Sequence, residues 1–271
     1  MGKMGSVLLP REFEFMDGTE GPSLPDILYP FAVDEIMARR VGEGRRPLIH
    51  MWTHPRAMVI GLRDRRLPSA EKAMEDLRKE GYEVAVRNSG GAAVPLDEGV
   101  VNLSIILPNP ERTMDFRQDF DVMVELIRGS LLGSGASVEA GEIAGAYCPG
   151  DYDLSIRGRK FCGIAQRRQT KAYVIQAFVV AEGSGERRAE RVREFYRTAA
   201  EGASDGAYPV VKPESMASLQ ELTGSGGGQA FAAGVRRFLS AQPGMKKVVP
   251  GELPKEEIRA MIPALRARYD R

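Results

Sequence analysis

The sequence contains few of the residues that most often build metal sites. Its 271 residues include two cysteines and two histidines. A four-cysteine zinc site is therefore excluded, and a site with two cysteines and two histidines would use every candidate. Cys148 and Cys162 lack CxxC spacing, and His50 and His54 lack the intervening glutamate of an HExxH helix. We expect neither a metal nor another cofactor.

The charges and the apolar runs exclude two kinds of partner. Lys and Arg number 38 against 37 Asp and Glu, so the net charge of +1 offers no broad field for nucleic acid. The apolar runs VVNLSIILP and YVIQAFVVA have strand length, whereas a membrane helix needs about 20 residues. The N-terminal MGKMGSVLLPREFEF does not resemble a secretory signal. With two free-standing cysteines, these features predict a cytoplasmic protein that binds neither nucleic acid nor membrane.

The scarcity of histidine also restricts the chemistry of an enzyme. A Ser-His-Asp site would have to use His50 or His54, and no GxSxG motif accompanies either one. An enzyme built on this sequence would therefore depend on cysteine or lysine.

Hydrophobic periodicity predicts an α+β protein with a mixed, mostly antiparallel sheet flanked by helices. The expected strands come in local groups: two in 46–61, three in 82–108, a hairpin in 151–168 and one in 171–181. We expect a single domain over residues 1–271, with residues 205–271 forming a helical C-terminal extension. The expected helices are 31–41, 69–80, 116–132, 188–200, 215–224, 231–242 and 254–270.

The segment RNSGGAAV, from Arg87 to Val94, contains two adjacent glycines. Such a pair lets the backbone approach a ligand closely and present amide groups to a carbonyl or an anion. The alternative interpretation is an ordinary tight hairpin turn.

A second segment, from Arg157 to Lys171, is basic throughout. It has no Asp or Glu, and its cations are Arg157, Arg159, Lys160, Arg167, Arg168 and Lys171. The segment could dock an acidic partner or a phosphate. Alternatively, its cations protect a solvated hairpin edge against aggregation.

A third segment, Ala146 to Gly150, presents a possible nucleophile. Proline and glycine follow Cys148 directly and predict a turn that would expose its thiol. Cys162 competes for this role: it lies two residues from Lys160 in an apolar strand, so the two side chains should face the same side. Either cysteine could instead be a small buried hydrophobic residue.

Two of these segments together resemble a known family. VRNSGGAAVPLDEGVVNLSI is similar to the Arg-Arg-x-Ser-Gly-Gly-Gly…Gly-Asn-Leu signature of lipoate–protein ligases and lipoyl/octanoyl transferases. YDLSIRGRKFCGIAQ is similar to their Asn-Asp-Ile/Leu…Gly-x-Lys-Ile-x-Gly-x-Ala-Gln segment. The matching positions are Arg87, Ser89, Gly90, Gly91, Val94, Asp97, Gly99, Asn102, Asp153, Leu154, Gly158, Lys160, Gly163, Ala165 and Gln166.

The sequence departs from the ligase pattern at five positions, and these departures argue against an ATP-dependent ligase that handles an acyl-adenylate. Val86, Ala92, Pro95, Leu96 and Tyr152 replace the usual residues. AYCPGDYDLSI is instead similar to the corresponding sequence of family members that transfer an octanoyl group between amides through a nucleophilic cysteine. The resemblance thus favours Cys148 over Cys162 and implies the fold of the biotin/lipoate protein ligase catalytic domain.

The resemblance also implies a reaction and its partners. An octanoyl group would pass from a lysine of the glycine cleavage H protein to a lysine in lipoyl domains of 2-oxoacid dehydrogenase complexes. Cys148 would carry it as a thioester, and Lys160 would assist by charge or proton transfer. The residues implied to bind substrate are Arg87, Ser89, Gly90, Gly91, Asp153 and Gly163. The alternatives are transfer from octanoyl-acyl carrier protein, ATP-dependent lipoate ligation, and a catalytically silent carrier-binding protein.

Overall fold

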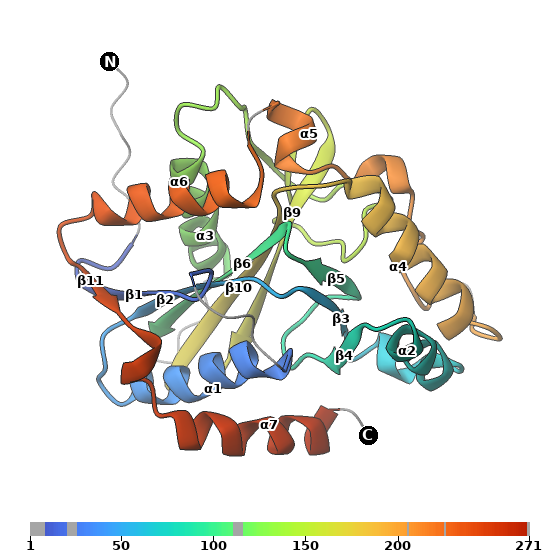
Figure 1. Cartoon of the computed structure of the whole chain (residues 1–271), viewed down its shortest axis with the longest axis horizontal. Helices are drawn as coiled ribbons and strands as arrows, with labels where there is room; N and C mark the ends of the chain where they lie inside the picture. Colours follow the sequence, from blue (N-terminus) through green and yellow to red (C-terminus); the bar gives the residue numbers. More distant parts are fainter. Residues whose placement is uncertain (1–8, 21–25, 111–115, 205, 225, 270–271) are drawn as a thin grey trace.

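The strands form one large and one small sheet, shown in the computed structural model of Figure 1. The structure describes residues 9–20, 26–110, 116–204, 206–224 and 226–269. Within them, the large sheet has eight strands in the order β11-β1-β2-β6-β10-β9-β8-β7. Its strands are β1 (Phe13–Asp17), β2 (Leu48–Trp52), β6 (Val100–Pro108), β7 (Glu139–Ala140), β8 (Leu154–Ile156), β9 (Arg159–Arg168), β10 (Ala172–Val180) and β11 (Met245–Val248).

Pairing in the large sheet is mixed. The pairs from β2 through β6, β10, β9 and β8 to β7 are antiparallel, and β1 pairs in parallel with both β2 and β11. The two-residue turn Arg157–Gly158 joins β8 to β9, and both residues have a positive φ, 52° and 73°. A type I′ hairpin turn requires this conformation, and glycine adopts it at no steric cost. The expected mostly antiparallel sheet and the 151–168 hairpin are therefore confirmed.

The small sheet lies at one end of the large one and carries the SGG segment. It consists of β3 (Arg56–Ile60) between β4 (Glu83–Val86) and β5 (Val94–Asp97). The residues between β4 and β5 are Arg87 to Ala93, the segment that contains both glycines. Helices α2 (Ala70–Lys79) and α4 (Gly185–Ala199) pack together against this sheet.

Helices cover both faces of the large sheet (Figure 1). Helix α1 packs on one face with α7 outside it, and α3 and α6 pack together on the other face. No described helix is both long and apolar enough to cross a bilayer. The remaining helices are α1 (Leu28–Gly42), α3 (Phe116–Ser130), α5 (Leu219–Thr223), α6 (Gly228–Ser240) and α7 (Lys255–Tyr269).

These layers create two hydrophobic cores separated by the large sheet. One core joins α1, α2 and α4 to the small sheet, and the other joins α3, α5 and α6 to the opposite face. Strand β6 is buried on both faces, which explains its almost continuous apolar run. Alternation along β6 turns Asn102 and Ser104 towards α1 and leaves Leu103 and Ile105 in the other core.

The structure corrects two features of the predicted layout. Residues 205–271 contain the expected helices α5, α6 and α7, but they also supply β11, which pairs with β1 and completes the large sheet. The two strands of 46–61 do not stay together either, since β2 joins the large sheet and β3 the small one. Neither feature has a signature in local periodicity.

Candidate active site

Cys148 lies in an irregular loop before β8 and has a backbone conformation that is unusual for a residue with a side chain. Its φ is +49°, and the residue is 7% exposed. A left-handed conformation costs free energy outside glycine and persists only where neighbouring contacts hold it. The contacts around this loop therefore determine where the sulfur lies.

Lys160 provides two of those contacts from the start of β9. Its Nζ donates hydrogen bonds to the carbonyl oxygens of Tyr147 (2.9 Å) and Cys148 (2.6 Å). The same Nζ lies 2.8 Å from Asp153 Oδ2 in an ion pair that is almost completely buried. Burial raises the pKa of Asp153 to about 6, while the charge of Lys160 acts in the opposite direction. Lys160 thus contacts the main chain of the cysteine loop and not the sulfur.

The sulfur is contacted from the other side by the SGG segment. Arg87 Nη2 donates to Cys148 Sγ at 3.1 Å, and the Ala92 amide donates to it at 3.3 Å. Arg87 Nη2 also donates to the Ala92 carbonyl at 2.6 Å, which closes the segment into a compact loop. Gly91 has a φ of +102°, and a Cβ there would lie 2.7 Å from Cys148 Sγ and 2.3 Å from Arg87 Nη2. Glycine is therefore required at position 91 by both conformation and space.

A buried tyrosine and an aspartate support this loop from behind. The Ala93 amide donates to Tyr196 Oη at 3.2 Å, and that hydroxyl donates to Asp64 Oδ1 at 3.0 Å. Burial raises the pKa of Asp64 and also that of Tyr196, whose hydroxyl therefore remains protonated as a donor. Tyr196 comes from α4, so the helix beside the small sheet helps to position the SGG segment.

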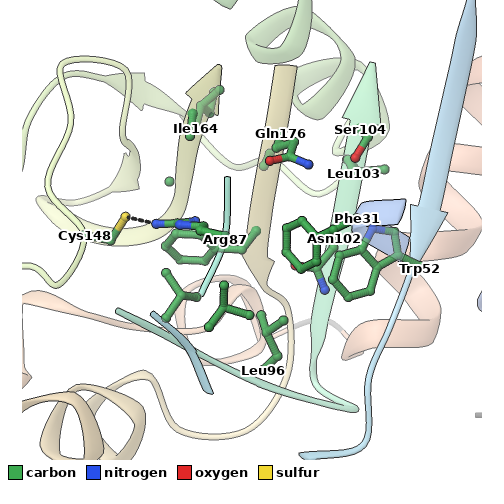
Figure 2. Close-up of a pocket in the computed structure, with 16 residues that line it drawn as sticks. Phe31, Trp52, Arg87, Leu96, Asn102, Leu103, Ser104, Cys148, Ile164 and Gln176 are labelled. Carbon is green, nitrogen blue, oxygen red and sulfur yellow. Dashed lines mark hydrogen bonds between the residues drawn. The ribbon is translucent and has the colours of Figure 1, made fainter. Parts of the chain in front are cut away.

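A largely apolar pocket begins at the sulfur and runs across the sheet (Figure 2). Its cavity volume is about 30 Å³, below the roughly 300 Å³ at which small-molecule sites usually begin. Figure 2 shows Cys148 and Arg87 at one end and Phe31, Asn102 and Trp52 at the other. Its lining residues are Phe31, Trp52, Val59, Arg87, Val94, Leu96, Asn102, Leu103, Ser104, Cys148, Gly163, Ile164, Ala165, Gln176, Ala177 and Phe178. This lining suits a short apolar chain attached at Cys148, but the side chains that line the pocket would have to move apart to admit one.

A buried polar network supports the pocket beneath α1. Asp34 Oδ2 accepts hydrogen bonds from Ser104 Oγ (2.5 Å) and Gln176 Nε2 (2.8 Å). Its Oδ1 lies 3.0 Å from His50 Nδ1. His50 is therefore part of the buried network beneath the pocket. There it holds the carboxylate of Asp34, from α1, against the large sheet.

Cys162 lies on the opposite side of the sheet. It is fully buried in the core formed with α3 and α6, and burial raises the pKa of its thiol. The expectation that Cys162 and Lys160 share a face is wrong because of a β-bulge. Leu154 pairs with Cys162 and Ser155 with Lys160, so Phe161 is an extra residue and the alternation of side chains is broken.

The other predicted binding residues divide between the pocket and its surroundings. Gly163 lines the pocket, and a Cβ there would lie 2.5 Å from the Phe178 ring. Ser89, which is buried, and Gly90 line a second hollow that Gly91 and Pro149 also line. A Cβ at Gly90 would meet no atom within 4 Å, so this position does not require glycine for space.

The basic segment is largely neutralised within the molecule. The ion pairs are Arg159–Glu186, Lys160–Asp153, Arg167–Glu35 and Arg168–Asp119. Of its six cations, Arg157 and Lys171 are the two without a carboxylate partner in the described part of the chain. They occupy the turns at opposite ends of β9. The segment therefore does not present one continuous positive surface.

The sequence motifs did not reveal two contributors to the site. Ala92 acts through its amide, which any residue type would supply. Tyr196 lies in α4, and the highly charged sequence of this helix gave no sign that the tyrosine hydroxyl would be buried beside the site. In the described residues, no group of three or more His, Cys, Asp or Glu side chains is arranged to hold a metal ion.

Comparison with known proteins identifies sequence relatives over most of the chain. The lipoyl protein ligase A/B catalytic domain matches residues 26–235. An octanoyl-[GcvH]:protein N-octanoyltransferase from Bacillus velezensis is 42% identical over 227 residues, covering 82% of this chain and 79% of the relative. An enzyme of the same name from Geobacillus kaustophilus is 46% identical over 206 residues, covering 75% and 72%. A lipoyl-[GcvH]:protein N-lipoyltransferase from Listeria monocytogenes is 38% identical, covering 78% and 76%.

Solved structures share the fold. Lipoate-protein ligase A bound with ATP superposes with a TM-score of 0.69 at 19% identity, covering 92% of this chain and 94% of that one. A lipoate protein ligase from Thermoplasma acidophilum with bound lipoic acid gives the same TM-score and identity, covering 93% and 95%. At this identity the matches establish the fold alone, and they confirm the expected ligase-like architecture.

Proposed function

The chain belongs to the lipoyl protein ligase A/B catalytic domain family, and on this basis we propose that it is an octanoyltransferase that works through a thioester on Cys148. The donor is the octanoylated lysine of the glycine cleavage H protein, in agreement with the names of the relatives. The acceptors are lysines of lipoyl domains in 2-oxoacid dehydrogenase complexes. The observation that carries the proposal is the position of Cys148 Sγ, at the end of an apolar pocket and within reach of two hydrogen-bond donors.

The reaction exchanges the amide on the donor lysine for an amide on the acceptor lysine through a thioester intermediate. The sulfur attacks the donor carbonyl, a C–S bond forms and the C–N bond breaks, and the thiol proton leaves with the donor amine. The acceptor amine then attacks the thioester, the C–S bond breaks and the sulfur regains the proton that this amine gives up. Because the bonds broken and formed are equivalent, the overall exchange is nearly balanced and needs no nucleotide.

The pocket supports an apolar acyl chain as the group in transit. Its walls are aromatic and aliphatic, with Phe178, Val59 and Leu96 among them. Burying such a chain is favourable by roughly 0.8 kcal/mol for each methylene group. We also propose a cytoplasmic location, because a nucleophilic Cys148 must remain a free thiol in order to react.

Intact-mass spectrometry of the protein mixed with octanoylated H protein tests the proposal. We expect an adduct of octanoyl mass that hydroxylamine removes, that is absent from Cys148→Ser and that persists in the matched control Cys162→Ser. Full transfer activity in Cys148→Ser would overturn the thioester mechanism.

The same assay separates the alternatives. Octanoyl-acyl carrier protein as a second donor tests the carrier-protein reaction, and added ATP with free lipoate tests ligation. A lipoylated H protein tests whether the group in transit is lipoyl, as the name of the Listeria relative suggests. Binding of the lipoyl domain without any adduct would indicate a silent carrier-binding protein.

A further inference from the structure

The second hollow adjoins the apolar pocket at the cysteine loop. Cys148 lines the pocket, and the next residue along the chain, Pro149, lines the hollow. Gly91 also lines the hollow, and a Cβ at this position would lie 2.7 Å from Cys148 Sγ. The sulfur therefore lies between the two cavities, and the residue that separates it from the hollow has no side chain.

The second hollow is open to the surface and is much larger than the pocket. Its cavity volume is about 630 Å³, against about 30 Å³ for the pocket. Leu62, Arg63 and Ala207, which line it, are exposed. Another lining residue, Tyr208, stacks on Tyr196, and the two ring centroids are 5.3 Å apart. One wall of the hollow is therefore packed on the same tyrosine that supports the SGG segment.

The proposed reaction needs a route by which a lysine of a carrier protein reaches the sulfur. Once the acyl chain fills the apolar pocket, the lysine that gives or receives it must approach from another side. A lysine carries its amine on a flexible four-carbon stem, so a narrow opening admits it while the rest of the carrier stays outside. The second hollow provides such an opening beside Cys148.

The edge of the second hollow carries exposed apolar and cationic side chains. The described residues include four large apolar side chains that are exposed, and two of them lie here: Leu62 lines the hollow, and Val210 follows the lining residue Pro209. Arg63 is exposed and forms no ion pair with a described residue. The carboxylate among the described lining residues, Asp64, is 2% exposed. This edge is therefore complementary to a protein surface that is apolar and acidic.

Resting on the proposed octanoyl transfer, we propose that the second hollow admits the lysine side chain of a carrier domain and that its edge is the surface on which the carrier docks. The partner is a carrier domain with an apolar residue and a carboxylate beside its lysine. Leu62 packs on the apolar residue, and Arg63 pairs with the carboxylate. Donor and acceptor dock in turn on this one surface, because the thioester holds the acyl group between the two encounters.

Carrier binding to a protein that cannot form the thioester tests this surface. In the Cys148→Ser background, fluorescence anisotropy measures the Kd for octanoylated H protein. We expect Leu62→Glu and Arg63→Glu each to raise Kd by about fivefold or more, the loss typical of an interface residue that contributes to affinity. In Arg63→Glu, Kd should also depend less on salt concentration. Arg39→Glu is the matched control, because this exposed arginine lines a different hollow, between α1 and α7, and Kd should stay within about twofold.

A lipoyl domain as the second ligand tests whether both carriers use the same surface. We expect Leu62→Glu and Arg63→Glu to weaken its binding as well, and thermal unfolding verifies that each variant is folded. Unchanged Kd values in both variants would overturn the proposal, and so would an equal loss in Arg39→Glu or a loss for H protein alone. The Kd values do not depend on acyl transfer, so failure of the docking surface is distinguishable from failure of the thioester mechanism, which the mass-spectrometric assay tests.

Discussion

At the scale of single residues, the two glycines of the SGG segment occupy very different surroundings. Gly91 has a positive φ and faces Cys148 Sγ and Arg87, whereas a Cβ at Gly90 would meet nothing within 4 Å. We expect Gly91→Ala to lower kcat/KM for octanoyl transfer by about a hundredfold, because displacing reacting groups by about 1 Å has an effect of this size. Gly90→Ala should stay within about twofold of wild type and is the matched control.

For both variants, kcat/KM is measured from the steady-state rate of octanoyl transfer from octanoylated H protein. Circular dichroism verifies that each variant is folded. Equal losses in the two variants would contradict this explanation of the motif. They would indicate that the segment needs flexibility at both positions.

Residue types were easier to predict from the sequence than their contacts. Of the predicted residues, Arg87 and Gly91 lie at the sulfur of Cys148, and Gly163 lines the pocket. Lys160 and Asp153 form a buried ion pair that contacts the main chain of the cysteine loop. No feature of the sequence indicated that Lys160 Nζ donates to the main-chain carbonyls of Tyr147 and Cys148, because the packing of the folded chain decides which atoms a long side chain reaches. The bulge at Phe161, which separates Lys160 from Cys162, has no local sequence signal.

At the scale of elements, the short helix α5 stabilises the strand that carries Lys160. Ser218 and Glu221 form a reciprocal capping box at its start. The residues just before it contact β9: the Ala217 amide donates to the Lys160 carbonyl at 3.0 Å, and Arg159 donates to the Met216 carbonyl at 2.8 Å. The cap thus holds the segment that borders the active-site strand.

We expect Ser218→Ala to destabilise the protein by about 1–2 kcal/mol, since the Glu221 amide loses its acceptor. Thermal unfolding should show Tm lowered by about 2–8 °C. Ser215→Ala is the control, because the Ser215 hydroxyl donates only to the nearby Lys212 carbonyl. A Tm shift no larger than that of the control would contradict a stabilising role for the cap.

Helices and strands were predictable from periodicity where each element has its own pattern. Strands β4, β5 and β6 follow the expected order between their turns, and α1 and α3 span the expected apolar stripes. Strand β11 was missed because Met245–Val248 contains two lysines and has one buried residue, so only its pairing with β1 makes it a strand. Ser69 begins α2 as expected, yet its side chain makes no capping hydrogen bond.

At the scale of the whole molecule, internal ion pairs determine which charges are available to a partner. Arg157 and Lys171 lie about 30 Å apart along β9, several Debye lengths at physiological salt. They do not act as one patch. We therefore expect Arg157→Glu and Lys171→Glu to leave the KM for octanoylated H protein within about twofold of wild type.

The measurement is KM at low and at physiological salt for each variant. A severalfold rise in KM that disappears at the higher salt would restore the basic segment as a docking surface. Charge reversal at Arg167 or Arg168 does not provide this test, because it would also break the contacts with Glu35 and Asp119.

The separation of the two cysteines by the large sheet has a consequence for oxidative damage. The chain has two cysteines, and they belong to the cores on opposite faces. A sulfenic acid formed at Cys148 thus has no resolving thiol of its own chain on its side of the sheet. Recovery would have to come from a small diffusible thiol such as glutathione, entering by the route that admits the acyl chain. An occupied pocket would then shield the enzyme from peroxide, and an empty one would leave it vulnerable.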